Sequence, residues 1–191
     1  MEGKVFLGIE STAHTLGIGI YSEEEGILAN VYDTYMGKDG ILPREAADHH
    51  SRLFAELLSR AFEESRLSIA DIDVVAVAQG PGIGAPLSFG VAMARYLASK
   101  YGKELVGVNH PYAHIVIVEE ASGVNASLVL YVSGGNTQIL AKGSDGLFYV
   151  LGETLDIGMG NLYDTFMRKA GIRPAHGSKL SEIASKGSFV A

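Results

Sequence analysis

Two histidines, His110 and His114, stand four residues apart, directly after an apolar run at 105–108. The sequence predicts that this run is a short strand ending at Asn109, and that Pro111 lies in the first turn of a helix. On a helix, side chains four residues apart project from one face, so the two imidazoles can bind a single divalent metal ion. Taken alone the spacing is short and unspecific, and one histidine that caps or packs against the strand end, with the other facing solvent, would explain it better.

A second stretch, 130–137, reads LYVSGGNT and favours a functional role for the histidine pair. It places a tight turn of small polar residues directly after an apolar strand. Glycines gather where a backbone must bend sharply or come close to a ligand. The two stretches together, rather than the histidine spacing alone, mark the region where we expect chemistry.

Composition bounds the class of protein. The chain has 191 residues, 47% of them hydrophobic and 19% charged, which suits one large domain or one domain and part of a second. The absence of cysteine excludes disulfides and thiol catalysis. A net charge of −7 argues against nucleic-acid binding over the whole surface, but it allows a local basic patch. Because no secretory signal or membrane-length apolar run is found, we expect a cytoplasmic protein with no membrane partner.

The elements that position the candidate residues follow from hydrophobic periodicity. Strands are expected over 5–9, 16–21, 27–35, 74–78, 103–108, 127–132, 138–142 and 147–151, and helices over 43–66, 87–101, 110–121, 162–170 and 179–186. The first three strands have connections too short for crossovers, so they predict an antiparallel meander. The same strand and turn plan recurs over 127–151.

Two such meanders, each opening a mixed α/β unit, resemble the duplicated actin-like and Hsp70-like ATPase (ASKHA) fold, which sugar kinases share. In that fold the two hairpin turns hold nucleotide phosphates with their backbone amides. We expect a complete first domain over 1–125, which carries the histidine pair. The start of a second, truncated domain is expected over 126–191.

The sequence leaves the roles of two further features open. The glycine-rich segment 79–86 joins a strand to a helix, where it could hold a phosphate or serve as a close turn that supports helix packing. It lacks the Lys-Ser/Thr pair of a Walker loop. His49 and His50 are adjacent on a predicted helix and cannot share a face, so a structural role is expected for at least one of them.

Six stretches carry a resemblance, and they read, in order, GIESTAHTLGIGI, REAADHH, QGPGIG, GVNHPYAHI, LYVSGGNTQIL and GETLDIGMGN. The chain, from residue 5 to about residue 184, resembles the universal tRNA threonylcarbamoyladenosine synthase family. That family comprises the catalytic subunit of the archaeal and eukaryotic KEOPS complex and bacterial TsaD, and the Ala-His-Thr of the first turn resembles the archaeal and eukaryotic branch. The resemblance implies a transferase that moves threonylcarbamoyl from threonylcarbamoyl-AMP to N6 of the adenosine 3′ of the anticodon. Its tRNA substrates read codons that begin with adenine.

The resemblance also implies ligands and site residues. A divalent metal, Fe²⁺ or Zn²⁺, would bind His110 and His114, and Tyr131 would lie at that metal. ATP or threonylcarbamoyl-AMP would be the nucleotide ligand. Residues expected to bind this substrate are Tyr131, Val132, Ser133, Gly134, Gly135, Asp164, as a ribose contact, and Gly177. Without the resemblance, Asp164 would be expected to be a solvated helix residue, and no residue is assigned as a catalytic acid or base.

Expected partners are tRNA and subunits of the KEOPS type, namely a kinase, a dimeriser and a tRNA binder. The alternative is a non-catalytic assembly paralogue of the TsaB type that forms a homodimer through its first domain. The length favours that alternative, whereas the intact histidine pair favours the transferase. A metallopeptidase is rejected, because the spacing lacks the Glu of H-E-x-x-H.

Three departures from the family pattern affect the expected activity. The family's third metal ligand, an Asp near its C-terminus, has no counterpart in this chain. Segment 174–178 reads PAHGS where the family has Phe-Pro-Gly-Gly-Pro, and the Glu that follows is displaced (to Glu182) or lost, with Ser181 at its place. Residues 114–116 read His-Ile-Val where the family often has His-Ile-Glu, so Val116 is a further departure. We therefore expect an impaired nucleotide half and little or no transfer by the chain alone.

Overall fold

The computed structural model describes residues 3–37 and 41–189. The chain divides into two compact units, Met1–Ile117 and Val118–Ala191, each of which is described by itself. The expected domain boundary after residue 125 stays a prediction. Within the described residues, no helix combines the length and apolarity needed to cross a membrane.

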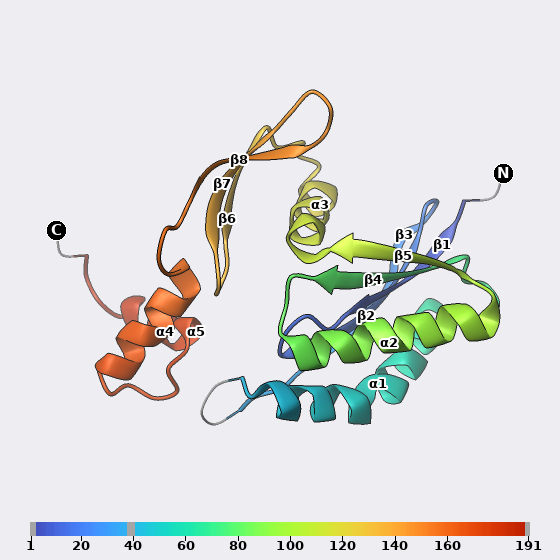
Figure 1. The fold of residues 1–191 in the computed structure, drawn as a ribbon, viewed down its shortest axis with the longest axis horizontal. Helices are drawn as coiled ribbons and strands as arrows, with labels where there is room; N and C mark the ends of the chain where they lie inside the picture. The colour runs from blue at the N-terminus through green and yellow to red at the C-terminus, as the bar shows by residue number, and fades with distance from the viewer. Residues whose placement is uncertain (1–2, 38–40, 190–191) are drawn as a thin grey trace. The chain divides into compact units, whose positions relative to one another are not determined.

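A five-stranded sheet is the centre of the first unit (Figure 1). It contains β1 (Val5–Glu10), β2 (Thr15–Ser22), β3 (Gly26–Thr34), β4 (Val74–Gly80) and β5 (Glu104–Asn109), in the order β3-β2-β1-β4-β5. The first three strands are antiparallel neighbours, whereas β4 runs parallel to both β1 and β5. The predicted meander is confirmed, and β1, β4 and β5 end at the same edge of the sheet.

Two helices pack side by side on this sheet, α1 (Pro43–Ser65) and α2 (Gly84–Tyr101) (Figure 1). Helix α1 begins with Pro43, whose fixed φ suits the first helical position, and ends at Arg66 in the left-handed region with φ 60°. Buried side chains from both helices and from the strands form the core between them, including Leu7, Ile18, Leu57, Val75 and Leu97. This core fixes the strand ends that carry the candidate site.

Helix α3 (His110–Ser122) begins directly after β5, as predicted. The Asn109 side chain accepts a hydrogen bond from the backbone N–H of Tyr112 at 3.0 Å. That bond satisfies one of the free amides at the helix start, as an N-terminal cap does. The cap places His110 at the first position of the helix.

The second unit opens with an antiparallel sheet of β6 (Leu128–Val132), β7 (Thr137–Lys142) and β8 (Phe148–Glu153), in that order. The repeated meander is thus confirmed. Helices α4 (Met159–Lys169) and α5 (Gly177–Ala184) follow and pack on each other. Helices α4 and α2 both begin three residues earlier than predicted, at Met159 and Gly84. In α4, close packing of Gly160 on the Gly134 backbone outweighs the low helix propensity of glycine.

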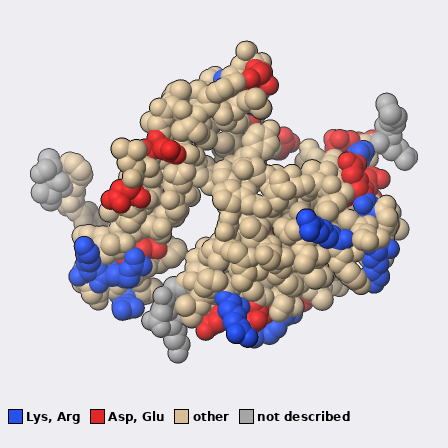
Figure 2. All heavy atoms as spheres, in the orientation of Figure 1, with Lys and Arg blue, Asp and Glu red and all other residues tan. Residues whose placement is uncertain are grey.

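Positive charge gathers on the two helices of the second unit. Although the chain carries −7 net, five of its 15 Lys and Arg residues lie on, between or just after α4 and α5: Arg168, Lys169, Arg173, Lys179 and Lys186. Figure 2 shows basic side chains grouped over these helices. Glu182 pairs with two of them, Lys179 at 2.8 Å and Lys186 at 2.9 Å.

Candidate metal site and substrate turn

The two histidines of α3 point at each other through the same ring atom. The distance between the Nε2 atoms of His110 and His114 is 3.1 Å, with the ring planes at 81°. An ion held tetrahedrally at about 2.0–2.1 Å from two imidazole nitrogens keeps those nitrogens about 3.3–3.4 Å apart. The pair therefore fits a divalent metal ion with a shift of a few tenths of an ångström.

The Glu10 carboxylate, at the end of β1, is hydrogen-bonded to the His110 ring. Glu10 Oε2 lies 2.9 Å from His110 Nδ1, and the backbone N–H of Thr12 donates to Glu10 Oε1 at 2.5 Å. The Thr12 hydroxyl lies 3.2 Å from the same ring nitrogen. Sequence reasoning missed Glu10, although one signal could have found it: the carboxyl ends of parallel strands share one sheet edge, where ligand sites gather.

The charges of this cluster suit metal binding. Burial raises the pKa of Glu10, but hydrogen bonds from His110 and Thr12 outweigh it and hold the pKa below its usual range. Burial, together with the nearby His110, lowers the pKa of His114, although Glu10 works in the opposite direction. At neutral pH the carboxylate is charged and the His114 imidazole is neutral, and only a neutral imidazole offers a lone pair to a metal.

The glycine-rich segment between β4 and α2 packs against the turn that carries Thr12. The backbone N–H of Ile83 donates to the Thr12 carbonyl at 2.6 Å, and a Cβ on Gly82 would lie 2.5 Å from that oxygen. Within α2, a Cβ on Gly90 would lie 1.9 Å from Ser11 Oγ. Of the two roles left open by the sequence, close packing is the one for which the structure gives contacts.

The expected substrate turn joins β6 to β7 in the second unit. Ser133 closes it, since its backbone N–H and its hydroxyl both donate to the Asn136 carbonyl, at 2.8 and 2.9 Å. The two glycines face open space: a Cβ on Gly135 would meet no atom within 4 Å, and one on Gly134 only Asn161 Oδ1 at 3.8 Å. A ligand can therefore approach their backbone.

Helix α4 supports this turn from behind, which sequence reasoning did not foresee. Its backbone N–H groups donate into the turn, from Gly160 to the Ser133 carbonyl and from Asn161 to the Gly134 carbonyl, both at 3.1 Å. A Cβ on Gly158 would lie 2.6 Å from the backbone nitrogen of Asn136. The signal was the Gly-Met-Gly-Asn sequence itself, because glycines at a helix start permit such an approach.

The remaining predicted residues lie in the same unit. Val132 is the last residue of β6, and Tyr131 pairs with Gln138 on β7. Asp164 is half-buried and follows Gly160 by four residues, so it lies on the face of α4 that packs on the turn. Gly177 begins α5, where the nearest atom to an added Cβ would be in the Tyr163 ring at 3.8 Å.

The structure thus brings together two groups of predicted residues, the histidine pair in one unit and the turn with α4 in the other. Tyr131 belongs to the second unit, so its place at the metal stays a prediction. Among residues 3–37 and 41–189, no three or more His, Cys, Asp or Glu side chains converge as ligands. The pair supplies two ligand nitrogens, and Glu10 lies on the opposite side of the His110 ring.

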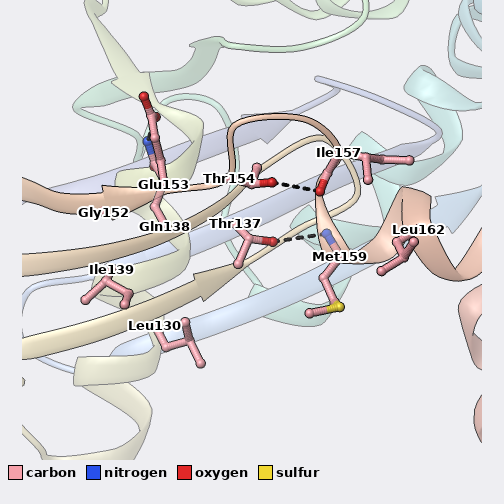
Figure 3. A pocket seen from close by; sticks show the side chains of 10 residues that line it. All are labelled: Leu130, Thr137, Gln138, Ile139, Gly152, Glu153, Thr154, Ile157, Met159 and Leu162. Atoms are coloured by element: carbon pink, nitrogen blue, oxygen red, sulfur yellow. Dashed lines mark hydrogen bonds between the residues drawn. The ribbon is translucent and has the colours of Figure 1, made fainter.

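A pocket of about 380 Å³ lies beside the turn in the second unit (Figure 3). Its walls are mostly apolar, with Leu130, Ile139 and Met159 among them. The Met159 N–H donates to Thr137 Oγ1 at 3.0 Å, and the Thr154 hydroxyl donates to the Ile157 carbonyl at 2.9 Å. None of the predicted site residues lines this pocket.

Solved structures of low sequence identity share the fold. YeaZ from Pseudomonas aeruginosa matches with a TM-score of 0.54 at 11% identity, over 79% of this chain and 66% of that one. Ethanolamine utilization protein EutJ from Carboxydothermus hydrogenoformans matches with a TM-score of 0.52 at 15% identity, over 90% and 59%. The predicted actin-like α/β fold is thereby confirmed.

Sequence relatives are far closer. The profile of the TsaD family, described as tRNA N6-adenosine threonylcarbamoyltransferase, matches residues 26–191. Relatives of that name from Thermococcus gammatolerans and Hyperthermus butylicus are 51% and 54% identical. The matches cover 96% and 89% of this chain but 56% and 47% of the relatives, so the chain spans about half their length. On this similarity, the chain belongs to the TsaD family of tRNA N6-adenosine threonylcarbamoyltransferases.

Proposed function

We propose that this chain carries the metal-binding and substrate-turn half of a tRNA N6-adenosine threonylcarbamoyltransferase. The observation that carries the proposal is the convergence of His110 and His114 at 3.1 Å, backed by Glu10. An assembly paralogue of the TsaB type would have no use for such a pair. The names of the close sequence relatives support the transferase over that alternative.

His110 and His114 would hold the metal ion, Fe²⁺ or Zn²⁺, and Tyr131 is proposed to contact it. When bound, such an ion supplies Lewis-acid polarisation of a carbamoyl or phosphate oxygen. The chain prepares the pair for this task, since His114 is neutral at neutral pH and its ring faces that of His110. The fold thus holds the two ligand nitrogens within 3.1 Å of each other.

The turn after β6 is proposed to bind threonylcarbamoyl-AMP, made from ATP. The side of Gly134 and Gly135 from which a side chain would project is nearly open, and their backbone N–H groups are proposed to donate to phosphate or carbamoyl oxygens. Val132 and Ser133 hold the turn in place, Asp164 accepts hydrogen bonds from ribose hydroxyls, and Gly177 lines the nucleotide. In the transfer, adenosine N6 bonds to the carbamoyl carbon, the bond from that carbon to the AMP oxygen breaks, and N6 loses a proton.

Proposed partners are tRNA and KEOPS-type subunits (a kinase, a dimeriser and a tRNA binder), in the cytoplasm. The basic side chains on α4 and α5 support a tRNA partner, because phosphate contacts depend on Lys and Arg. A homodimer would be expected only of the TsaB-type alternative.

A chimera tests the proposal. This chain replaces the matching half of the Thermococcus gammatolerans relative, and threonylcarbamoyladenosine in tRNA is measured by mass spectrometry. We expect the chimera to form the modified nucleoside, and the double variant His110→Ala, His114→Ala to lose it by at least about a hundredfold, because a lost Lewis acid removes several kcal/mol of stabilisation. A folded chimera whose activity survives the double substitution would contradict the proposed site, and a folded but inactive parent chimera would favour the assembly role.

A further inference from the structure

Glu10 lies 100 residues before His110 in the sequence, yet its carboxylate meets the ring of that histidine. We propose that Glu10 is a positioning residue that sets which nitrogen of His110 is free to bind the metal. The inference rests on the proposed metal site and adds to it a residue that acts through His110 and need not touch the ion.

The contact with Glu10 determines which nitrogen of the His110 ring carries the proton. An ionised carboxylate can only accept hydrogen bonds, so the 2.9 Å contact requires that Nδ1 carry the hydrogen. A neutral imidazole has one ring N–H, and Nε2 is then left with its lone pair. That nitrogen is the one that faces His114 at 3.1 Å. Glu10 therefore selects the form of His110 that can act as a ligand through Nε2.

Glu10 is itself held at both of its carboxylate oxygens. Its two oxygens have separate partners, since Oε1 accepts from the Thr12 N–H while Oε2 accepts from His110. Thr12 is 2% exposed and is itself fixed by the 2.6 Å bond from Ile83. The carboxylate thus stands on the rigid end of β1, and its orientation does not depend on the metal.

The substitution Glu10→Gln separates the effects of charge and tautomer from the effect of side-chain shape. In Glu10→Gln, the amide oxygen would keep the Thr12 bond, and the amide –NH₂ would face His110 Nδ1. That group donates, so it favours a bare Nδ1 and a hydrogen on Nε2, which blocks the metal ligand. Asp33→Asn is the matched control, because Asp33 also pairs with a histidine of this unit, His49, at 2.8 Å.

The experiment measures Zn²⁺ affinity by chelator competition in the 191-residue chain. We expect Glu10→Gln to weaken binding about 10–100-fold, Asp33→Asn to leave it unchanged, and His110→Ala to abolish it. Wild-type affinity in Glu10→Gln, with binding lost in His110→Ala, would overturn the role of Glu10 and leave the metal site standing. Unchanged binding in His110→Ala would overturn the metal site and this inference with it.

A second measurement needs no variant and covers the case in which Glu10→Gln fails to fold. Nitrogen-15 NMR of the metal-free wild-type chain reports which nitrogen of His110 bears hydrogen. We expect the Nδ1–H form, and in a folded Glu10→Gln chain a shift toward Nε2–H, which loss of packing alone would not produce. Nε2–H in the wild type would refute the inference.

Discussion

At the scale of single residues, His50 on α1 is buried in an unusual way. It is 0% exposed, its Nε2–H donates to the Ala13 carbonyl at 3.1 Å, and its Nδ1 has no hydrogen-bond partner among the described residues. Burial lowers the pKa of His50; the Ala13 bond and Glu10 oppose this, whereas His49 and His14 add to it. His50 therefore stays neutral in the folded chain at pH values where a free histidine is charged.

This burial predicts a loss of stability in mild acid. Below about pH 6.5, His50 is protonated in the unfolded chain but stays neutral in the folded chain. The free energy of unfolding therefore falls as pH drops. His50→Gln keeps a donor for Ala13 and removes the titration. Between pH 8 and pH 5, we expect the Tm of the wild type to fall more steeply than that of His50→Gln.

Leu57→Val is the control for that comparison. It removes one buried methylene from the same helix, at about 0.5–1.5 kcal/mol, without changing any charge. Its Tm should lie below that of the wild type by a similar amount at every pH. Parallel curves for the wild type and His50→Gln would show that His50 does not carry the acid sensitivity.

At the scale of elements, the start of α4 determines the shape of the substrate turn. A Cβ on Gly160 would lie 2.8 Å from Gly134 Cα and 3.1 Å from the Ser133 carbonyl, both of them backbone atoms that cannot swing aside. Helix propensity alone would favour alanine over glycine by about 1 kcal/mol. The contact outweighs that gain, because overpacking costs about 1–3 kcal/mol and also shifts the turn.

We therefore expect Gly160→Ala to lower the urea midpoint of the second unit, followed by tyrosine fluorescence. Gly135→Ala is the matched control: nothing lies within 4 Å of its added Cβ, so stability should stay near that of the wild type. Equal stability of the two variants would mean that the turn shifts to accept the added methyl group at little cost in free energy.

The elements also show what the sequence could and could not predict. Both meanders, and the strand-to-helix change at Asn109, were predicted because hydrophobic period and turn residues are local signals. The early starts of α2 and α4 were missed, since Gly84 and Gly160 have low helix propensity, and only for Gly160 does the structure give close contacts that offset it. Glu10 was missed because its partner is 100 residues away, and only the order β1-β4-β5 brings the two together.

At the scale of the whole molecule, charge is unevenly divided. The chain is −7 net, yet the segment from α4 to just after α5 carries the five basic residues that are proposed to meet tRNA. Arg168 and Lys169 lie in the last turn of α4, where they also complement the negative end of the helix. Affinity for tRNA should therefore depend on these residues and on salt.

We expect Arg168→Glu with Lys169→Glu to weaken tRNA binding by about tenfold or more and to flatten its dependence on salt concentration, because two phosphate contacts become repulsions. Arg52→Glu with Arg60→Glu on α1 makes the same change in net charge and should have a much smaller effect. Filter binding at two or more salt concentrations distinguishes the pairs. Equal losses would mean that net charge, and not a local surface, controls binding.

The three-stranded sheet of the second unit has a consequence for how the protein behaves in solution. Strand β6, with the sequence LVLYV, lies at one edge of that sheet and carries no charge, and Leu130 on it is 68% exposed. Strand β8, at the other edge, exposes 65% of Leu151. A charge-free apolar edge such as β6 is a template for pairing between chains, which proteins otherwise prevent with lysines, prolines or bulges. Strand β8 has a register shift against β7 at Leu151, which is a protection of the last kind. Colloidal stability, rather than folding free energy, is thus expected to set the concentration at which this chain can be handled.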